Sequence, residues 1–205
     1  MDEIIAIYGS PRRNGNTATL LKESVAGARE AGARVHEVFL RDLKMSPCLE
    51  IYGCKKEGKC VIQDDFGDLR DRMLAAKGLM LASPVFFYTV SAHTKILMDR
   101  CQSLWVKKHW VENALPKPAT ERKGMFIGVG ATRGKKLFDG ILLTIRYFFE
   151  VLDMSLDQTL LYRGLDAEKD VLAHPEYLAE ARSAGRRFAE SLRVLGKPPD
   201  DAFAK

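Results

Sequence analysis

IIAIYGSPRRNGNT, residues 4–17, is the stretch of sequence from which the fold and a candidate site can both be inferred. A short apolar run ends at Gly9, a polar loop follows, and a helical pattern begins at Asn16 and Thr17. The first N–H groups of a helix have no partner within the helix and carry partial positive charge, so they bind anions readily. The order of strand, polar loop and helix start therefore predicts a phosphate site. The alternative is an ordinary strand-to-helix turn whose Gly, Pro, Asn and Ser are simply turn residues.

The same loop excludes two well-known nucleotide motifs. It contains no Gly-Lys-[Ser/Thr] sequence, so it is not a Walker loop. Five residues lie between Gly9 and Gly15, so it is not the G-x-G-x-x-G dinucleotide fingerprint either. What remains is a loop rich in hydroxyl, amide and guanidinium donors, which suits a single terminal phosphate held without a metal. The donors are Ser10, Arg12, Arg13, Asn14, Asn16 and Thr17.

The composition is typical of one globular domain. The chain has 205 residues, of which 46% are hydrophobic, and its net charge of +5 gives little support to nucleic-acid binding. We expect a single domain over residues 1–196 and a C-terminal tail over residues 197–205. The apolar run at residues 78–90 is too short for a membrane span and is interrupted by Pro84. With no signal segment recognised before the first strand, we expect a cytoplasmic protein that binds no membrane and keeps its cysteines as thiols or ligands.

Apolar, strand-like runs alternate with amphipathic stretches along the chain, which is typical of βαβ units and a parallel sheet. The expected strands are residues 3–8, 34–40, 78–83, 124–130 and 154–162. The expected helices are residues 16–31, 65–76, 91–104, 135–151 and a last helix from Pro175. Five strands with interleaved helices predict an α/β fold with a doubly wound sheet, and right-handed crossovers leave few topologies.

Two further loops leave strand carboxyl ends, where ligands of open α/β sheets bind. Residues 83–88 (SPVFFY) contain a turn fixed by Pro84, backbone amides at Val85 and Phe86, and aromatic rings that suit a flat ring system. Residues 130–134 (GATRG) offer Arg133 as a cation near any ring that gains negative charge. The alternatives are buried core aromatics for the first loop and a plain turn for the second. One loop for a phosphate and another for an aromatic ring system describe FMN.

These motifs resemble those of the flavodoxin-like NAD(P)H-dependent FMN reductase family, in the branch that includes the iron–sulfur flavoproteins. GSPRRNGNT is similar to that family's phosphate loop, and the block from Asp64 through Ser83-Pro84-Val85-Phe86-Phe87 to Asp99-Arg100 is similar to its central part. The likeness covers roughly residues 3–102, with the loop at 130–134 similar in character. It implies a flavodoxin-like, doubly wound, five-stranded parallel sheet of strand order 2-1-3-4-5.

The resemblance also implies an oxidoreductase that is a flavoprotein. Electrons would pass from NAD(P)H through FMN to a quinone, a nitro- or azo-aromatic, a flavin or a similar small-molecule acceptor, and the flavin would carry the chemistry without a catalytic side chain. A homodimer or homotetramer is implied as well. Phe86 and Phe87, with Trp105 or Trp110, are expected to wall the acceptor pocket. The implied cofactor-binding residues are Ser10, Arg12, Asn14, Asn16, Thr17, Pro84, Val85, Phe86, Phe87, Ala131, Thr132 and Arg133.

Three cysteines lie in one loop, at positions 48, 54 and 60, and Cys101 stands apart on a helix. Cluster-bearing relatives use a compact run of four cysteines near this place, so Cys48, Cys54 and Cys60 are candidate cluster ligands. Their wide spacing favours free thiols and no metal site. Two alternatives to the enzyme remain open: an electron carrier of the flavodoxin or iron–sulfur flavoprotein type, and a thiol-based redox sensor. Asp99-Arg100 is interpreted as a helix-surface or subunit contact.

Overall fold

The computed structural model describes residues 3–113 and 121–194, so the predicted tail at 197–205 lies outside the described residues. Within these ranges the chain forms one five-stranded parallel sheet of order β2-β1-β3-β4-β5, which confirms the predicted topology. The strands are β1 (Glu3–Tyr8), β2 (Arg34–Phe39), β3 (Gly78–Pro84), β4 (Lys123–Gly130) and β5 (Ser155–Arg163).

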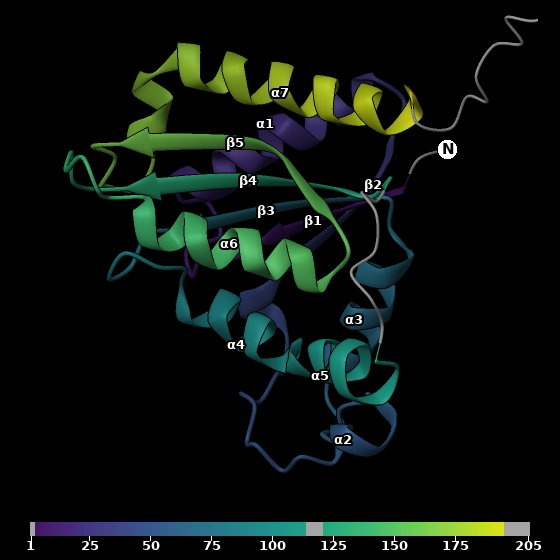
Figure 1. The fold of residues 1–205 in the computed structure, drawn as a ribbon. Helices are drawn as coiled ribbons and strands as arrows, with labels where there is room; N and C mark the ends of the chain where they lie inside the picture. The colour runs from purple at the N-terminus through teal and green to yellow at the C-terminus, as the bar shows by residue number, and fades with distance from the viewer. Residues whose placement is uncertain (1–2, 114–120, 195–205) are drawn as a thin grey trace, which may run out of the picture.

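Helices cover both faces of the sheet, as Figure 1 shows: α1 and α7 lie on one face, and α3, α4, α5 and α6 lie on the other. The short helix α2 lies in a loop beyond α4 and α5. The α-helices are α1 (Asn16–Glu30), α2 (Cys54–Glu57), α3 (Phe66–Ala75), α4 (Ala92–Arg100), α5 (Gln102–Val106), α6 (Asp139–Val151) and α7 (Pro175–Val194). Two 3-10 turns, η1 (Leu40–Asp42) and η3 (Asp170–Ala173), and a π-helical turn, η2 (Lys107–Val111), complete the described elements.

The strand pattern explains the two hydrophobic cores. β3 and β4 are buried along almost their whole length, because parallel strands at the centre of a doubly wound sheet carry helices on both faces. One set of alternate side chains, such as Ile4 and Met80, packs against α1 and α7. The other set, such as Ile5 and Leu79, packs against the helices of the opposite face. Because all five strands are parallel, their carboxyl ends lie at the same edge of the sheet.

Helices α1 and α7 pack unusually closely against each other. A Cβ atom added at Gly27 on α1 would lie 1.9 Å from the Arg182 carbonyl oxygen on α7, and one added at Gly185 would lie 1.9 Å from the Ser24 carbonyl oxygen. The Ser24 hydroxyl also donates a hydrogen bond to the Ala181 carbonyl oxygen at 2.9 Å. The two backbones can approach this closely only because glycine has no side chain at the crossing.

Candidate functional site

The loops that leave β1, β3, β4 and β5 are tied together at the carboxyl edge of the sheet. Three backbone N–H groups each donate across strands at 2.8 Å, and the pairs are Gly9 to Ala82, Val85 to Val129 and Gly164 to Gly130. The segments singled out from the sequence therefore lie at one edge and not at scattered places on the surface. This is the edge at which ligands of open α/β sheets bind.

The loop after β1 leaves the start of α1 open. Gly15 is the N-cap of α1 and supplies no capping side chain, so the first N–H groups of the helix have no side-chain partner at this end. A Cβ atom at Gly15 would lie 3.0 Å from Cβ of Arg12 and 3.6 Å from the Ser10 hydroxyl, so the loop folds closely over the helix end. Ser10 and Thr17 are buried beside it. Free N–H groups with nearby hydroxyls fit a phosphate.

The predicted donors of this loop differ in what they contact. The Asn16 side chain donates to the Ala167 carbonyl oxygen at 2.9 Å and accepts from the Val171 N–H at 3.1 Å, so its amide holds the segment after β5. Arg12 is exposed and donates to the Asp166 carbonyl oxygen at 3.2 Å. Asn14 accepts from Lys22 at 3.0 Å. Thr17 is only 3% exposed, and its hydroxyl makes no hydrogen bond to the rest of the described chain, so it is the side chain most available to a ligand.

In the loop after β3 the aromatic side chains at the tip are exposed, whereas the first backbone N–H groups are hydrogen-bonded within the chain. The Val85 N–H donates to the Val129 carbonyl oxygen, and the Phe86 N–H donates to the Thr89 carbonyl oxygen at 2.9 Å. Both N–H groups are therefore bonded within the chain, and the expectation that these backbone amides would contact a flat ring system is wrong. Phe87 and Tyr88 follow with φ of 49° and 61°, which is uncommon for large residues, and Phe87 is fully exposed. Backbone strain of this kind clusters at ligand sites.

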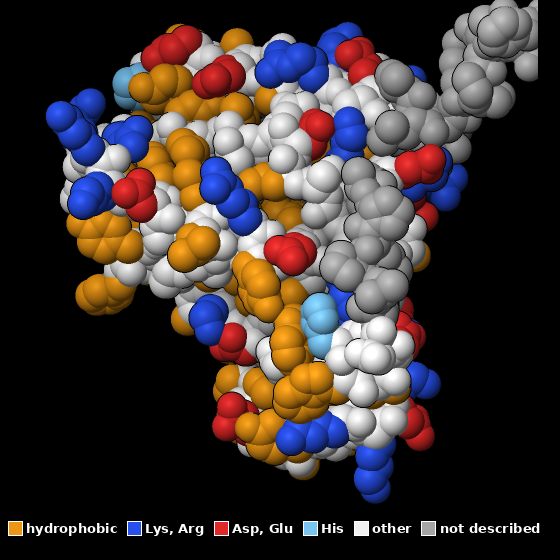
Figure 2. Space-filling view, in the orientation of Figure 1, with side chains coloured by type: hydrophobic (Ala, Val, Ile, Leu, Met, Phe, Trp, Pro, Cys, Tyr) orange, Lys and Arg blue, Asp and Glu red, His pale blue; other side chains and the backbone are white. Residues whose placement is uncertain are grey.

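The loop after β4 is exposed and cationic. Ala131, Thr132 and Arg133 are all exposed, and the Arg133 guanidinium lies over Gly164, where an added Cβ would come within 2.8 Å of Nη2. Lys135 and Lys136 follow on the same exposed segment. Figure 2 shows Lys and Arg side chains gathered at the corresponding left edge of the molecule. The positive charge at this edge favours an anionic ligand.

A buried polar network beneath the first two loops was missed from the sequence. The Ser91 hydroxyl donates to the Gly9 carbonyl oxygen at 2.5 Å and caps α4 by accepting from the Thr94 N–H at 3.3 Å. The Ser91 N–H in turn donates to the Ser83 hydroxyl at 3.0 Å. A Cβ at Gly9 would lie 2.1 Å from the Thr94 hydroxyl, so the position requires glycine. A serine directly before the first residue of α4 is an N-cap signal, which could have indicated the role of Ser91.

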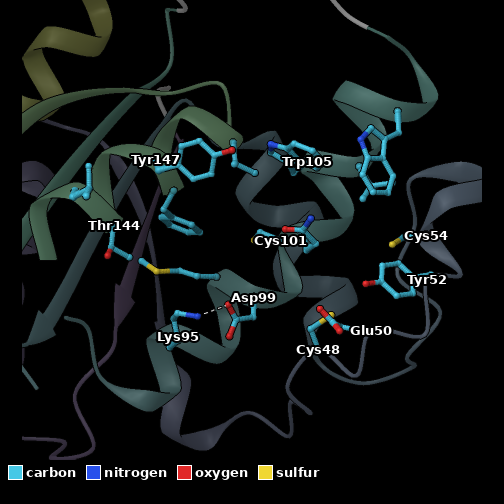
Figure 3. Close-up of a pocket in the computed structure, with 17 residues that line it drawn as sticks. Cys48, Glu50, Tyr52, Cys54, Lys95, Asp99, Cys101, Trp105, Thr144 and Tyr147 are labelled. Atoms are coloured by element: carbon cyan, nitrogen blue, oxygen red, sulfur yellow. Dashed lines mark hydrogen bonds and ion pairs between the residues drawn. The ribbon is translucent and has the colours of Figure 1, made fainter. Parts of the chain in front are cut away.

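Cys48 and Cys54 lie apart from this edge, in a groove of about 910 Å³ between α4, α5 and α6. In Figure 3, Thr144 and Tyr147 of α6 face Lys95, Asp99 and Trp105, while the loop that carries Tyr52 and Cys54 closes the other end. The lining includes Trp105 and Trp110 but not Phe86 or Phe87. The prediction that Trp105 or Trp110 lines the acceptor pocket together with Phe86 and Phe87 is therefore wrong within this chain.

The cysteines do not form a recognisable metal centre. In residues 3–113 and 121–194, no group of three or more His, Cys, Asp or Glu side chains is arranged to hold a metal ion. Cys101 is 1% exposed, and burial raises the pKa of its thiol to about 12, so it is a protonated core residue. Burial also raises the pKa of Cys54.

The interpretation of Asp99-Arg100 as a surface pair is wrong for Arg100. Its side chain is buried and contacts the Asp64 carboxylate at 2.5 Å and the carbonyl oxygens of Ser46 and Ile62 at 2.9 and 3.2 Å. Asp99 is exposed and pairs with Lys95 at 2.6 Å. Arg100 thus fastens both ends of the cysteine-bearing loop to α4. Its partner Asp64 lies 36 positions away in sequence, which no local pattern reveals.

None of the helices in the described part of the chain combines the length and apolar character that crossing a membrane requires.

Comparison with known proteins gives one family and several close relatives. A family model described as NADPH-dependent FMN reductase matches residues 3–139. An iron–sulfur flavoprotein of Methanocaldococcus jannaschii is 32% identical over 95% of this chain and 100% of its own length. An iron–sulfur flavoprotein of Archaeoglobus fulgidus is 31% identical over 94% of this chain and 98% of its own length.

Solved structures share the fold at low sequence identity. A flavone reductase matches with a TM-score of 0.70 and 20% identity, covering 94% of this chain and 64% of its own. An NAD(P)H:quinone oxidoreductase from Methanothermobacter marburgensis matches with a TM-score of 0.66 and 16% identity, covering 90% of this chain and 94% of its own. At these identities the likeness concerns the fold alone.

Proposed function

The chain belongs to the NADPH-dependent FMN reductase family, and on that premise we propose that it binds FMN at the carboxyl edge of its sheet and oxidises NAD(P)H. The electrons then pass to a small acceptor such as a quinone, a nitro- or azo-aromatic, or a flavin. The observation that carries this proposal is the uncapped start of α1 beneath a closely folded loop with buried hydroxyls. Family membership supports FMN as the ligand whose phosphate would bind there.

The phosphate end of the proposed site is built from helix geometry and hydroxyls. The free N–H groups at the start of α1 and the hydroxyls of Ser10 and Thr17 would hold the phosphate oxygens, and Arg12 would add charge at the rim. The Asn16 side chain acts through the segment after β5, which it fixes against the loop. Ser91 and Thr94 position the loop from below.

The ring end of the proposed site is built from the loops after β3 and β4. Pro84 and Val85 are half-buried where β3 ends, and the exposed rings of Phe86 and Phe87 offer a flat apolar surface. Ala131, Thr132 and Arg133 approach from the neighbouring strand, and Arg133 would offset negative charge on the reduced ring. When bound, FMN supplies the two-electron chemistry between nicotinamide and acceptor. The chain needs only to bind, orient and partly shield it.

Removing the Thr17 hydroxyl with Thr17→Val is expected to weaken FMN binding by about tenfold, because a hydrogen bond to a charged phosphate contributes roughly 1.5 kcal/mol or more. Flavin fluorescence titration of the apoprotein measures the dissociation constant. Thr144→Val is the control, since that hydroxyl donates to Gly140 within α6. Equal affinities in the two variants would contradict the phosphate site.

The reaction itself is tested by adding NADPH or NADH, without air, to the FMN-loaded protein. Bleaching of the flavin absorption by either nicotinamide is the expected result. A flavin that only dithionite reduces would instead identify an electron carrier, the function that the names of the iron–sulfur relatives favour. The net charge of +5 weighs against that reading, because flavodoxin-type carriers are typically acidic to match basic partners. A protein that takes up no FMN would overturn both.

A further inference from the structure

The cysteine-bearing loop has the register of a cluster motif with one ligand missing. In a C-x2-C-x2-C run the first and third cysteines are six positions apart and the second lies midway. Cys48 and Cys54 are six positions apart, and the residue midway between them is Ile51. Cys60 follows as the next thiol along the chain. The loop therefore contains three of the four cysteines of such a motif, and the second cysteine is missing.

The backbone around Ile51 has a conformation that suits a cluster more than an ordinary loop. Glu50 and Tyr52, on either side of Ile51, have φ of 50° and 60°, and Gly58 has φ of 70°. Left-handed residues among right-handed ones turn successive N–H groups toward one side, and such concave backbones bind phosphate and iron–sulfur groups. Neither Glu50 nor Tyr52 is glycine, so this backbone is held against the usual preference of its residues.

The surroundings of the loop also match an anionic group. Arg100 binds the carbonyl oxygens of Ser46 and Ile62 at the two ends of the loop, and its charge interacts with the Cys60 thiol. Its Nε–H group is buried and has no hydrogen-bond partner among the described residues. A buried donor without a hydrogen-bond partner, on a side chain that interacts with the Cys60 thiol, is the kind of group that would stabilise a sulfide-rich, negatively charged cluster.

Cys101 and residue 51 are the two positions to consider for a fourth cysteine ligand. Cys101 lines the same groove as Cys48 and Cys54, but it is 1% exposed and packs in the core with Leu97 and Leu104, so its thiol would have to leave that core to bind iron. The side chain at position 51 is that of isoleucine, which cannot bind iron, and it is 58% exposed. Exposure means that another side chain can replace it without disturbing the packing.

We propose that Ile51 occupies the place of an absent cluster ligand, so that this chain holds no stable [4Fe–4S] cluster and Ile51→Cys alone restores one. The residues present therefore do not fit the group for which the relatives are named. The electron path of the wild-type chain then involves FMN without a cluster.

The test compares wild type, Ile51→Cys and Leu49→Cys, whose new thiol lies two residues out of register at a position 60% exposed. Each folded protein is incubated without air with equal amounts of ferrous and ferric iron and with inorganic sulfide, then desalted. Two Fe²⁺, two Fe³⁺ and four S²⁻ make one [4Fe–4S]²⁺ cluster, and each cysteine ligand loses its thiol proton on binding. Iron, acid-labile sulfide and the broad visible absorption are measured.

Ile51→Cys is expected to retain about four irons and four sulfides per chain, and the other two proteins well under one. Wild type that retains three or four irons with sulfide would overturn the proposal, whatever the variants do. Ile51→Cys that retains no more iron than Leu49→Cys would overturn it as well. The readout is iron and sulfide, so it is independent of whether the flavin is reduced by NAD(P)H.

Discussion

Replacing Arg100 with methionine is expected to lower the free energy of unfolding by about 3–5 kcal/mol, the usual cost of removing one partner of a buried ion pair. The Arg100 side chain has no solvent exposure, and the Asp64 carboxylate that it contacts is 12% exposed. The substitution also leaves the carbonyl oxygens of Ser46 and Ile62 without their donor. Denaturant unfolding near neutral pH measures the change.

The matched control for this prediction is Lys95→Met on the same helix. Lys95 pairs with Asp99 at 2.6 Å, but both side chains are about half exposed, so the loss should stay below about 0.5 kcal/mol. Similar losses in the two variants would show that the Arg100 contacts are worth no more than a surface pair.

The same ion pair gives the stability a pH dependence. Burial of Asp64 works to raise its pKa, but hydrogen bonds from Arg100 and from the N–H groups of Ser46 and Phe66 outweigh it and hold the pKa below its usual value. Because the folded pKa is lower than the unfolded one, this stabilisation is complete above about pH 5 and is lost as the pH falls through the folded pKa. In Arg100→Met the carboxylate loses its charged partner. Because burial without that partner raises the folded pKa of Asp64 toward or above the unfolded value, the part of the acid-side loss of stability that comes from Asp64 should be smaller or absent.

Substituting Gly27 with alanine is expected to destabilise the fold by about 3 kcal/mol, although alanine is the better helix former by about 1 kcal/mol. The new Cβ would lie 1.9 Å from the Arg182 carbonyl oxygen, which belongs to a helix backbone and cannot turn aside. The two helices would have to separate, and the hydrogen bond from Ser24 to Ala181 would lengthen. Thermal and denaturant unfolding both report the change.

Gly67→Ala is the control for the helix crossing. Gly67 lies in the first turn of α3, and nothing lies within 4 Å of a Cβ added there. The substitution should leave stability unchanged or raise it by up to about 1 kcal/mol. If Gly27→Ala were as stable as Gly67→Ala, the close approach of α1 and α7 would not exist in solution.

Much of the fold could be predicted because its signals are local. β1 has the predicted bounds, and the other strands and the long helices α1 and α7 lie within a residue or two of expectation. Apolar periodicity and the Gly and Pro residues at element ends are properties of neighbouring residues. The strand order came from the resemblance of the phosphate loop and central block to one family, and the structure confirms it.

The contacts made by the candidate site residues were predicted less completely, because their partners are distant in sequence. The three loops were found from their residue types, but the Val85 and Phe86 amides are used by Val129 and Thr89. Nothing local indicated that the Asn16 amide binds the segment at Ala167 and Val171. A charged residue on an amphipathic helix is normally at the surface, so Arg100 was misplaced. Only the folded chain reveals its partners.

The hydrogen bonds from Arg100 to the carbonyl oxygens of Ser46 and Ile62 have a consequence for protein engineering. One guanidinium sets the two anchor points of the loop, and both anchors are carbonyl groups that any residue supplies. Residues 47–61 therefore form a loop between two fixed ends, and within it α2 packs against α5 and η2. Exposed residues of this loop can be substituted while the strands and the carboxyl edge of the sheet keep their packing. A related protein's loop should be transferable as a graft with its junctions at Ser46 and Ile62.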